Sequence, residues 1–152
     1  MGYAICQNTS NVRIKRESIP AALAAVQSMA AVDLETGKAP MYSWVPMDFF
    51  KETSLEAILH VWRWNVEREY GGNGDVIMLN FRGEKLGSEE ELFSVLAPFI
   101  EHGGYIEMLG EDNELWRWVF WRGELRVERP RVIWDYEQLT PVSELMEGID
   151  LD

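Results

Sequence analysis

Residues 105 to 129 alternate between apolar and polar side chains with a period of two, which is typical of β-strands with one buried face. Two short polar connections, Asp112-Asn113 and Arg122-Gly123, divide this run into segments 105–109, 115–121 and 125–129. Connections this short join antiparallel neighbours, because parallel strands need a long crossover. The sequence therefore predicts a three-stranded antiparallel meander.

The register of this meander follows from the two connections, because side chains alternate strictly across a strand. A two-residue loop at the first connection places Leu109 opposite Trp116. A two-residue loop at the second places Phe120 opposite Leu125. The predicted core face carries Tyr105, Glu107, Leu109, Trp116, Trp118, Phe120, Leu125 and Val127, and the open face carries Ile106, Met108, Arg117, Val119, Trp121, Arg126 and Glu128.

Start signals predict three helices ahead of the meander. A helix through 21–31 follows Ser18 and Pro20, and helices over 54–64 and 89–97 follow capping boxes at Thr53-Ser54-Leu55-Glu56 and Ser88-Glu89-Glu90-Glu91. Shorter strands are predicted over 3–8, 12–15, 41–45 and 76–81, and a short last helix between Thr140 and Gly148. Together these elements predict one α+β domain over residues 1–152, an antiparallel sheet with about three helices packed on one face.

The chain offers few residues for catalysis. It holds two histidines, His60 and His102, and one cysteine, Cys6, and none has a neighbour at metal-ligand spacing. No phosphate-binding or dinucleotide-binding glycine motif is present, so no metal and no cofactor are predicted. Glu107 is the exception, because the predicted register places it among aromatic side chains, where burial raises the pKa of a carboxyl and suits it to act as a general acid. The alternative is that Glu107 lies at the margin of the sheet or pairs with an arginine such as Arg82.

A net charge of −12 excludes the simplest kinds of partner. A chain this acidic is repelled by bare nucleic acid and by anionic membranes, so direct binding to either is not expected. A single cysteine cannot form an internal disulfide, and the first residues lack the pattern of a signal peptide. We expect a cytoplasmic protein, in the host cytoplasm if a phage encodes it.

The acids and bases are unevenly distributed along the chain. Residues 84–114 hold nine acids and one lysine, a net charge of −8, whereas residues 115–131 have a net charge of +3 and residues 132–152 one of −6. One interpretation is a solvated surface that keeps the chain soluble. The other is a surface that docks on a basic partner through Glu89, Glu90, Glu91, Glu111, Asp112 and Glu114, with Arg117, Trp121 and Arg126 as aromatic and arginine anchors.

The segment GGYIEMLGEDNELWRWVF, residues 103–120, resembles a segment of small hypothetical proteins carried by bacterial phages and integrated elements. FRGEKLG, residues 81–87, and the stretch from Leu92-Phe93 to Ala97-Pro98 resemble the same group. This resemblance implies a phage or mobile-element origin and an α+β fold, and it carries no established activity. The order of helices and strands is also loosely similar to ferredoxin-like phage and plasmid proteins.

Two functions are compatible with these observations. The first is a non-enzymatic protein that binds and inhibits or modulates a host protein, such as a basic nucleic-acid-binding defence nuclease of the CRISPR type, whose nucleic-acid site the acidic surface mimics and blocks. The second is a small hydrolase or ligand-binding domain that uses Glu107 or His102 in an aromatic-lined pocket. A pocket that contains Glu107 with a strongly perturbed pKa favours the second, and a flat acidic surface without a pocket favours the first. The oligomeric state is not predicted.

Overall fold

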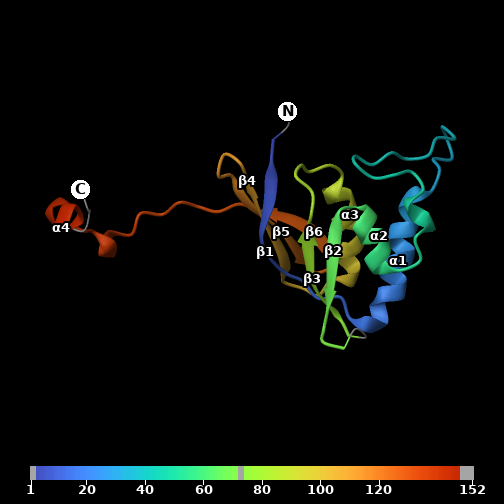
Figure 1. The fold of residues 1–152 in the computed structure, drawn as a ribbon, viewed down its shortest axis with the longest axis horizontal. Coiled ribbons are helices and arrows are strands. Elements are labelled where there is room, and N and C mark those ends of the chain that lie inside the picture. Colours follow the sequence, from blue (N-terminus) through green and yellow to red (C-terminus); the bar gives the residue numbers. More distant parts are fainter. Residues whose placement is uncertain (1–2, 72–73, 148–152) are drawn as a thin grey trace.

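The computed structural model describes residues 3–71 and 74–147, and it is shown in Figure 1. An antiparallel sheet has the strand order β1-β4-β5-β6, with β1 Ile5–Asn11, β4 Gly104–Gly110, β5 Leu115–Trp121 and β6 Glu124–Glu128. A second sheet pairs β2 (Trp64–Arg68) with β3 (Val76–Phe81). Helices α1 (Ile19–Gln27), α2 (Leu55–Val61) and α3 (Glu89–Leu96) lie together on one side of the strands (Figure 1). The predicted α+β class is confirmed.

Side chains of β1 join the two sheets along a seam between β1 and β3. The Phe81 N–H donates to Gln7 Oε1 at 2.7 Å, and the Leu79 N–H donates to Ser10 Oγ at 3.4 Å. An isolated antiparallel bridge at Ile14 extends the contact beyond β1. Here polar side chains satisfy backbone N–H groups that would otherwise be buried without partners. The strands therefore follow one another in the order β2-β3-β1-β4-β5-β6.

The second connection of the meander has the predicted geometry. Arg122 and Gly123 have φ values of 51° and 81°, both positive, as a two-residue type I′ hairpin loop requires. Phe120 pairs with Leu125, as expected. The predicted faces of β5 and β6 are therefore correct, and Trp116, Trp118 and Phe120 are buried.

The first connection is one residue longer than predicted, and this inverts β4. Asn113 has a φ of 67°, and the loop comprises residues 111–113, so Leu109 pairs with Leu115 rather than Trp116. A left-handed third residue is typical of three-residue hairpin loops. A shift of one residue moves every side chain of a strand to its other face. Ile106 and Met108 are therefore in the core, and Tyr105, Glu107 and Leu109 lie on the open face with Arg117.

Phe93 of α3 lies at the centre of the aromatic core. Its ring centroid is 5.1 Å from that of Trp118 on β5 and 4.9 Å from that of Trp64 on β2. The Phe120 ring centroid is 5.9 Å from that of Phe93. The side chains of Phe93, Trp118, Trp64 and Phe120 are all almost completely buried. Large aromatic rings supply much of the apolar area that a core removes from water. This cluster fixes α3 against both sheets.

The helix caps differ from the predicted capping boxes. Ser54, rather than Thr53, caps α2 by accepting a hydrogen bond from the Ala57 N–H at 3.1 Å. Ser88 makes no side-chain cap, because its Oγ accepts a hydrogen bond from the Ser43 N–H at 3.0 Å. A hydroxyl near a helix start has other backbone donors within reach. Here it holds the loop before α2 next to α3.

Two segments have a different secondary structure from the one predicted. The predicted strand over 41–45 is a turn, and the strand over 12–15 reduces to the bridge at Ile14. The predicted helix over 54–64 ends at Val61, because Arg63 adopts a positive φ of 73°. A left-handed residue ends a helix, and β2 begins directly after it.

The chain after β6 leaves the sheet as an extended segment and then forms α4 (Val142–Glu147), away from the other helices (Figure 1). The predicted last helix is confirmed, while Gly148, its predicted stop, lies outside the described residues. In the described residues, no helix is long and apolar enough to cross a membrane.

Two tryptophans of β5 provide a test of the observed faces. Trp118 is 1% exposed and Trp121 is 42% exposed. We expect Trp118→Ala to lower the free energy of unfolding by about 3–5 kcal/mol, because it leaves a cavity in the aromatic core. Trp121→Ala should cost about 1 kcal/mol. Urea denaturation followed by circular dichroism measures both, and equal losses would contradict this assignment of faces.

Candidate functional site

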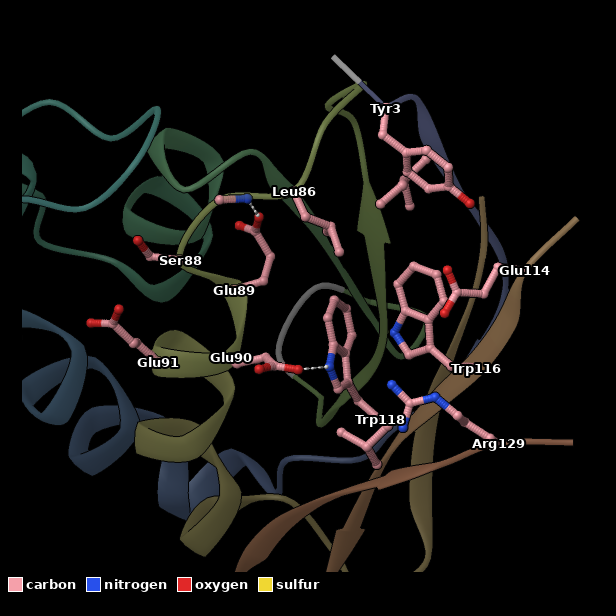
Figure 2. A pocket seen from close by; sticks show the side chains of 13 residues that line it. Tyr3, Leu86, Ser88, Glu89, Glu90, Glu91, Glu114, Trp116, Trp118 and Arg129 are labelled. Carbon is pink, nitrogen blue, oxygen red and sulfur yellow. Dashed lines mark hydrogen bonds between the residues drawn. The ribbon is translucent and has the colours of Figure 1, made fainter. Parts of the chain in front are cut away.

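A pocket of about 520 Å³ lies between the start of α3 and the core face of β5 (Figure 2). Its walls combine aromatic and acidic side chains. Tyr3, Trp116 and Trp118 supply the aromatic rings, Glu89, Glu90, Glu91 and Glu114 the carboxylates, and Arg129 a single cation. The first acids come from α3 and the last from the β4–β5 hairpin, so only the fold brings them together. We call this the acidic pocket.

Two indoles form one wall of the acidic pocket. The rings of Trp116 and Trp118 lie edge to face, with centroids 6.0 Å apart. The Trp118 Nε1–H donates to Glu90 Oε2 at 3.2 Å, which ties α3 to β5 at the pocket. Trp116 is 9% exposed, and its N–H has no hydrogen-bond acceptor among the described residues. Because both indoles are almost completely buried, this wall exposes little aromatic surface to the pocket.

The carboxylates take up different orientations around the indoles. Figure 2 shows Glu90 and Glu114 reaching toward the indoles from two sides, while Glu91 points away from them. The same view shows the guanidinium of Arg129 approaching the indoles from the end of β6. Glu90 and Glu114 are exposed, and within the described part of the chain neither is in an ion pair. Both carboxylates are therefore free to receive a cation.

Glu89 does not belong to an acidic docking surface, in contrast to the prediction. Its side chain is 1% exposed, and Oε1 accepts hydrogen bonds from Arg63 Nη2 at 2.8 Å and from the Gly87 N–H at 2.6 Å. Burial raises the pKa of this carboxyl, while the Gly87 N–H and the Arg63 guanidinium oppose the rise. Sequence reasoning missed this role because Arg63 is distant in the chain. The buried ion pair of Glu89 therefore stabilises the start of α3 at the acidic pocket.

Arg63 also fixes the loop that precedes α3. Its Nη1 donates to the Lys85 carbonyl at 2.7 Å, and its guanidinium lies 5.3 Å from the centre of the Phe81 ring. The planar guanidinium is pre-organised, so it loses little conformational entropy for each hydrogen bond that it forms. Arg63 thus joins the end of α2 to the loop over 82–88 at the rim of the acidic pocket.

Two of the predicted docking acids hold the start of β1. Asp112 accepts a hydrogen bond from the Tyr3 hydroxyl, which raises the pKa of Tyr3 and lowers the pKa of Asp112. Glu111 Oε1 accepts a hydrogen bond from the Ala4 N–H at 3.1 Å. Both side chains remain exposed. They position Tyr3 beside the acidic pocket and still add negative charge to this side of the molecule.

Glu107 lies on the open face of the sheet but is only 8% exposed, and its partners differ from the predicted ones. Its Oε1 accepts from Arg117 Nε at 2.7 Å, and Oε2 accepts from the Asn8 amide. The Arg117 guanidinium, followed by the Asn8 amide, lowers the pKa of Glu107. The ring of Tyr105 lies 4.5 Å from the Arg117 guanidinium. The carboxylate is thus held ionised, which is unfavourable for a general acid.

The other predicted anchors lie on or beside the open face, across the sheet from the acidic pocket. The Trp121 ring lies 4.1 Å from the His102 ring, and His102 Nδ1 accepts from the Arg122 N–H at 3.1 Å. Arg126 donates to Glu124 at 3.0 Å. The structure therefore separates the predicted partner-binding residues into two groups on opposite sides of the sheet.

Comparison with protein-family models, curated proteins and solved structures finds no match to this chain. The resemblance to phage proteins therefore stays a prediction. Within residues 3–71 and 74–147, no group of three or more His, Cys, Asp or Glu side chains is arranged to hold a metal ion.

We expect Arg63→Met to lower the free energy of unfolding by about 3–5 kcal/mol, because it leaves the buried Glu89 carboxylate without its cation. The double variant Arg63→Met/Glu89→Leu should recover a large part of this loss, since no charge is left buried. Arg68→Met is the matched control, because Arg68 pairs with the more exposed Glu56. Urea denaturation measures all three, and an Arg68→Met loss as large as that of Arg63→Met would contradict this role.

Glu107 should contribute to the acid sensitivity of the fold. Its pKa is lowered in the folded state, so its stabilisation is present above about pH 4.5 and is lost as the pH falls through the folded pKa. In Glu107→Gln the free energy of unfolding should fall less steeply below this pH. A slope remains, because the pKa values of Asp75 and Asp112 are lowered as well. Arg117→Met should flatten the profile in the same way, and an unchanged profile in both variants would contradict the pairing.

Proposed function

We propose that the chain is a non-enzymatic binding protein that docks on the basic surface of a partner protein. The docking surface consists of Glu90, Glu91, Glu111 and Glu114 around the acidic pocket. The observation that carries the proposal is the meeting of Glu90 and Glu114, from α3 and the β4–β5 hairpin, on two sides of an aromatic wall, with no ion pair to either carboxylate among the described residues. If these charges served only solubility, their convergence around one pocket would not be expected.

The physical character of this surface suits recognition of a basic protein. Carboxylates gathered over a hollow with apolar walls concentrate the negative potential there. Such a potential speeds the approach of a basic partner and disfavours acidic ones.

The class of partner follows from the same chemistry. A nuclease or another nucleic-acid-binding protein of the host carries a basic groove, and carboxylates can occupy the arginine and lysine sites that otherwise hold phosphates. We therefore propose inhibition of a host defence nuclease of the CRISPR type, by competition with nucleic acid. The resemblance of residues 103–120 to phage proteins supports this choice. A pocket of about 230 Å³ does border Glu107, but the ion pair with Arg117 lowers the pKa of this carboxyl, which gives a hydrolase less support.

The test is capture of a partner from bacterial lysate, its purification, and measurement of its affinity for the chain and for two charge-reversal variants. We expect Glu91→Lys/Glu114→Lys to weaken binding by about tenfold or more, and higher salt to weaken binding of the unchanged chain. Glu17→Lys/Glu35→Lys is the matched control, because it changes the net charge equally at exposed positions outside the pocket. Equal losses in both variants would show an effect of net charge alone and overturn the proposed surface.

A further inference from the structure

We infer that the protein forms a dimer in which the C-terminal segment of each copy docks on the free edge of the sheet of the other copy. This segment is residues 129–147, which we call the tail. Its anchor is Trp134, and the receptor is a hollow of about 330 Å³ beside β6, which we call the β6 hollow. The contact uses none of the carboxylates of the proposed docking surface, so the two proposals are independent.

The tail exposes a run of large apolar side chains to solvent. Trp134 is 83% exposed and Tyr136 is 80% exposed, on a segment that leads away from the sheet (Figure 1). Four aliphatic side chains of the tail are between 72% and 88% exposed, namely Val132, Ile133, Leu139 and Val142. Single exposed apolar residues are ordinary on a protein surface, whereas a contiguous set marks a contact surface. The tail therefore has the composition of a docking segment.

The β6 hollow offers an accessible apolar receptor at the edge of the sheet. Strand β6 ends the strand order, so its outer side has no strand neighbour in the described structure. The hollow is lined by Val119, Trp121, Arg126, Val127 and Glu128. Trp121 and Val127 are 42% and 43% exposed, so these walls are open to a ligand. An indole that enters the hollow removes apolar surface from water on both sides of the contact.

Opposite charges favour a second copy of this chain as the occupant of the β6 hollow. Residues 132–152, which include most of the tail, have a net charge of −6. Residues 115–131, which include the hollow, have a net charge of +3. Complementary charge governs the choice and the orientation of a partner. One sequence thus carries both halves of a complementary pair.

The charged groups stand next to the apolar ones on both sides of the contact. In the tail, Asp135 and Glu137 follow Trp134, and Asp135 caps a short helical turn by accepting from the Glu137 N–H at 2.9 Å. At the hollow, the Arg126 side chain is 62% exposed. It donates to Glu124 at 3.0 Å, and a guanidinium has further N–H groups for a second carboxylate. A docked Trp134 therefore places the tail acids near Arg126.

The backbone carries the tail away from the hollow of its own chain. Residues 129–135, all of them described, continue from β6 without a turn (Figure 1). A two-residue hairpin loop at Pro130-Arg131 would need a positive φ at its first residue. Proline is held at a φ of about −65°, so this tight return is closed to the chain. The tail is therefore available to another copy.

A reciprocal exchange of tails closes the assembly at two copies. Tail and hollow are different surfaces, so one-way contacts would extend from copy to copy, whereas two copies related by a two-fold axis satisfy each other. Stable interfaces bury about 1,200 Å² or more in total. The Trp134 and Tyr136 side chains of two tails can bury about 600–1,000 Å², and the surface that they cover adds to this area. The exchange therefore reaches the size of a stable interface.

The experiment measures the mass of the full chain in solution by sedimentation velocity over a range of concentrations. We expect a dimer that dissociates on dilution. Trp134→Ser should weaken the dimer by about tenfold or more, because it removes the aromatic anchor. Tyr70→Ser is the matched control, because Tyr70 is a fully exposed aromatic residue outside the tail and the hollow, and it should leave the dimer unchanged. Circular dichroism should show the same fold in both variants.

Two variants locate the receptor at the β6 hollow. Trp121→Ser and Arg126→Glu should each weaken the dimer, through an apolar wall and through the charge that faces the tail acids. Lys51→Glu is the control for Arg126→Glu, because it changes the net charge equally at an exposed position outside the hollow. Adding Glu137→Arg to Arg126→Glu should restore part of the lost affinity, because the two signs are exchanged.

A mixture of two defective variants tests whether the contact joins different copies. Trp134→Ser keeps an intact hollow and Trp121→Ser keeps an intact tail, so the mixture should associate more strongly than either variant does by itself. Its affinity should stay below that of the unchanged chain, because only one of the two contacts is complete. The inference is overturned if the unchanged chain is monomeric at its highest soluble concentration, if Trp134→Ser dimerises as well as Tyr70→Ser, or if the mixture associates no more than its components.

Discussion

The packing of Phe93 between Trp118 and Trp64 is the interaction on which the rest of the structure depends. It joins α3 to both sheets, with ring centroids about 5 Å apart on either side. Aromatic pairs in this edge-on or tilted geometry stabilise a core beyond the area that they bury. Because α3 is held here, its first turn has a fixed position over β5. The acidic pocket is the space that remains between them.

The burial of Glu89 also follows from the position in which Phe93 holds α3. Once α3 is fixed, its first residue points into the protein, and a buried carboxylate needs a cation and hydrogen-bond donors. Arg63 supplies the cation, and its left-handed backbone ends α2 at the position from which its side chain reaches Glu89. The helix end, the new strand β2 and the rim of the pocket are therefore parts of one arrangement. Glu90, one residue later, is left outside it and faces the pocket.

The separation of charged groups onto two sides of the sheet follows from the three-residue hairpin between β4 and β5. Its extra residue turns Glu107 outward, where Arg117 and Asn8 bind it. A two-residue loop would have placed that carboxylate among the buried indoles. The hairpin thus moves the only acid predicted on the core face to the opposite face, where it is 8% exposed and paired with Arg117, and it brings Glu114 to the edge of the acidic pocket.

Local patterns in the sequence determined the α+β class, the meander, α3, strand β3 and the type I′ turn at Arg122-Gly123, because each depends on periodicity or on backbone preferences of neighbouring residues. Only the tertiary structure decided the register of β4, since Asn113 tolerates either loop length and one residue inverts a strand. The end of α2 before Arg63 was likewise hidden, because no local turn signal marks Arg63 for its positive φ, and its side chain is held by contacts with distant residues. The sequence identified Glu90 and Glu114 as exposed acids. That they share one pocket with two indoles follows from packing between segments about 25 residues apart, which no local pattern encodes.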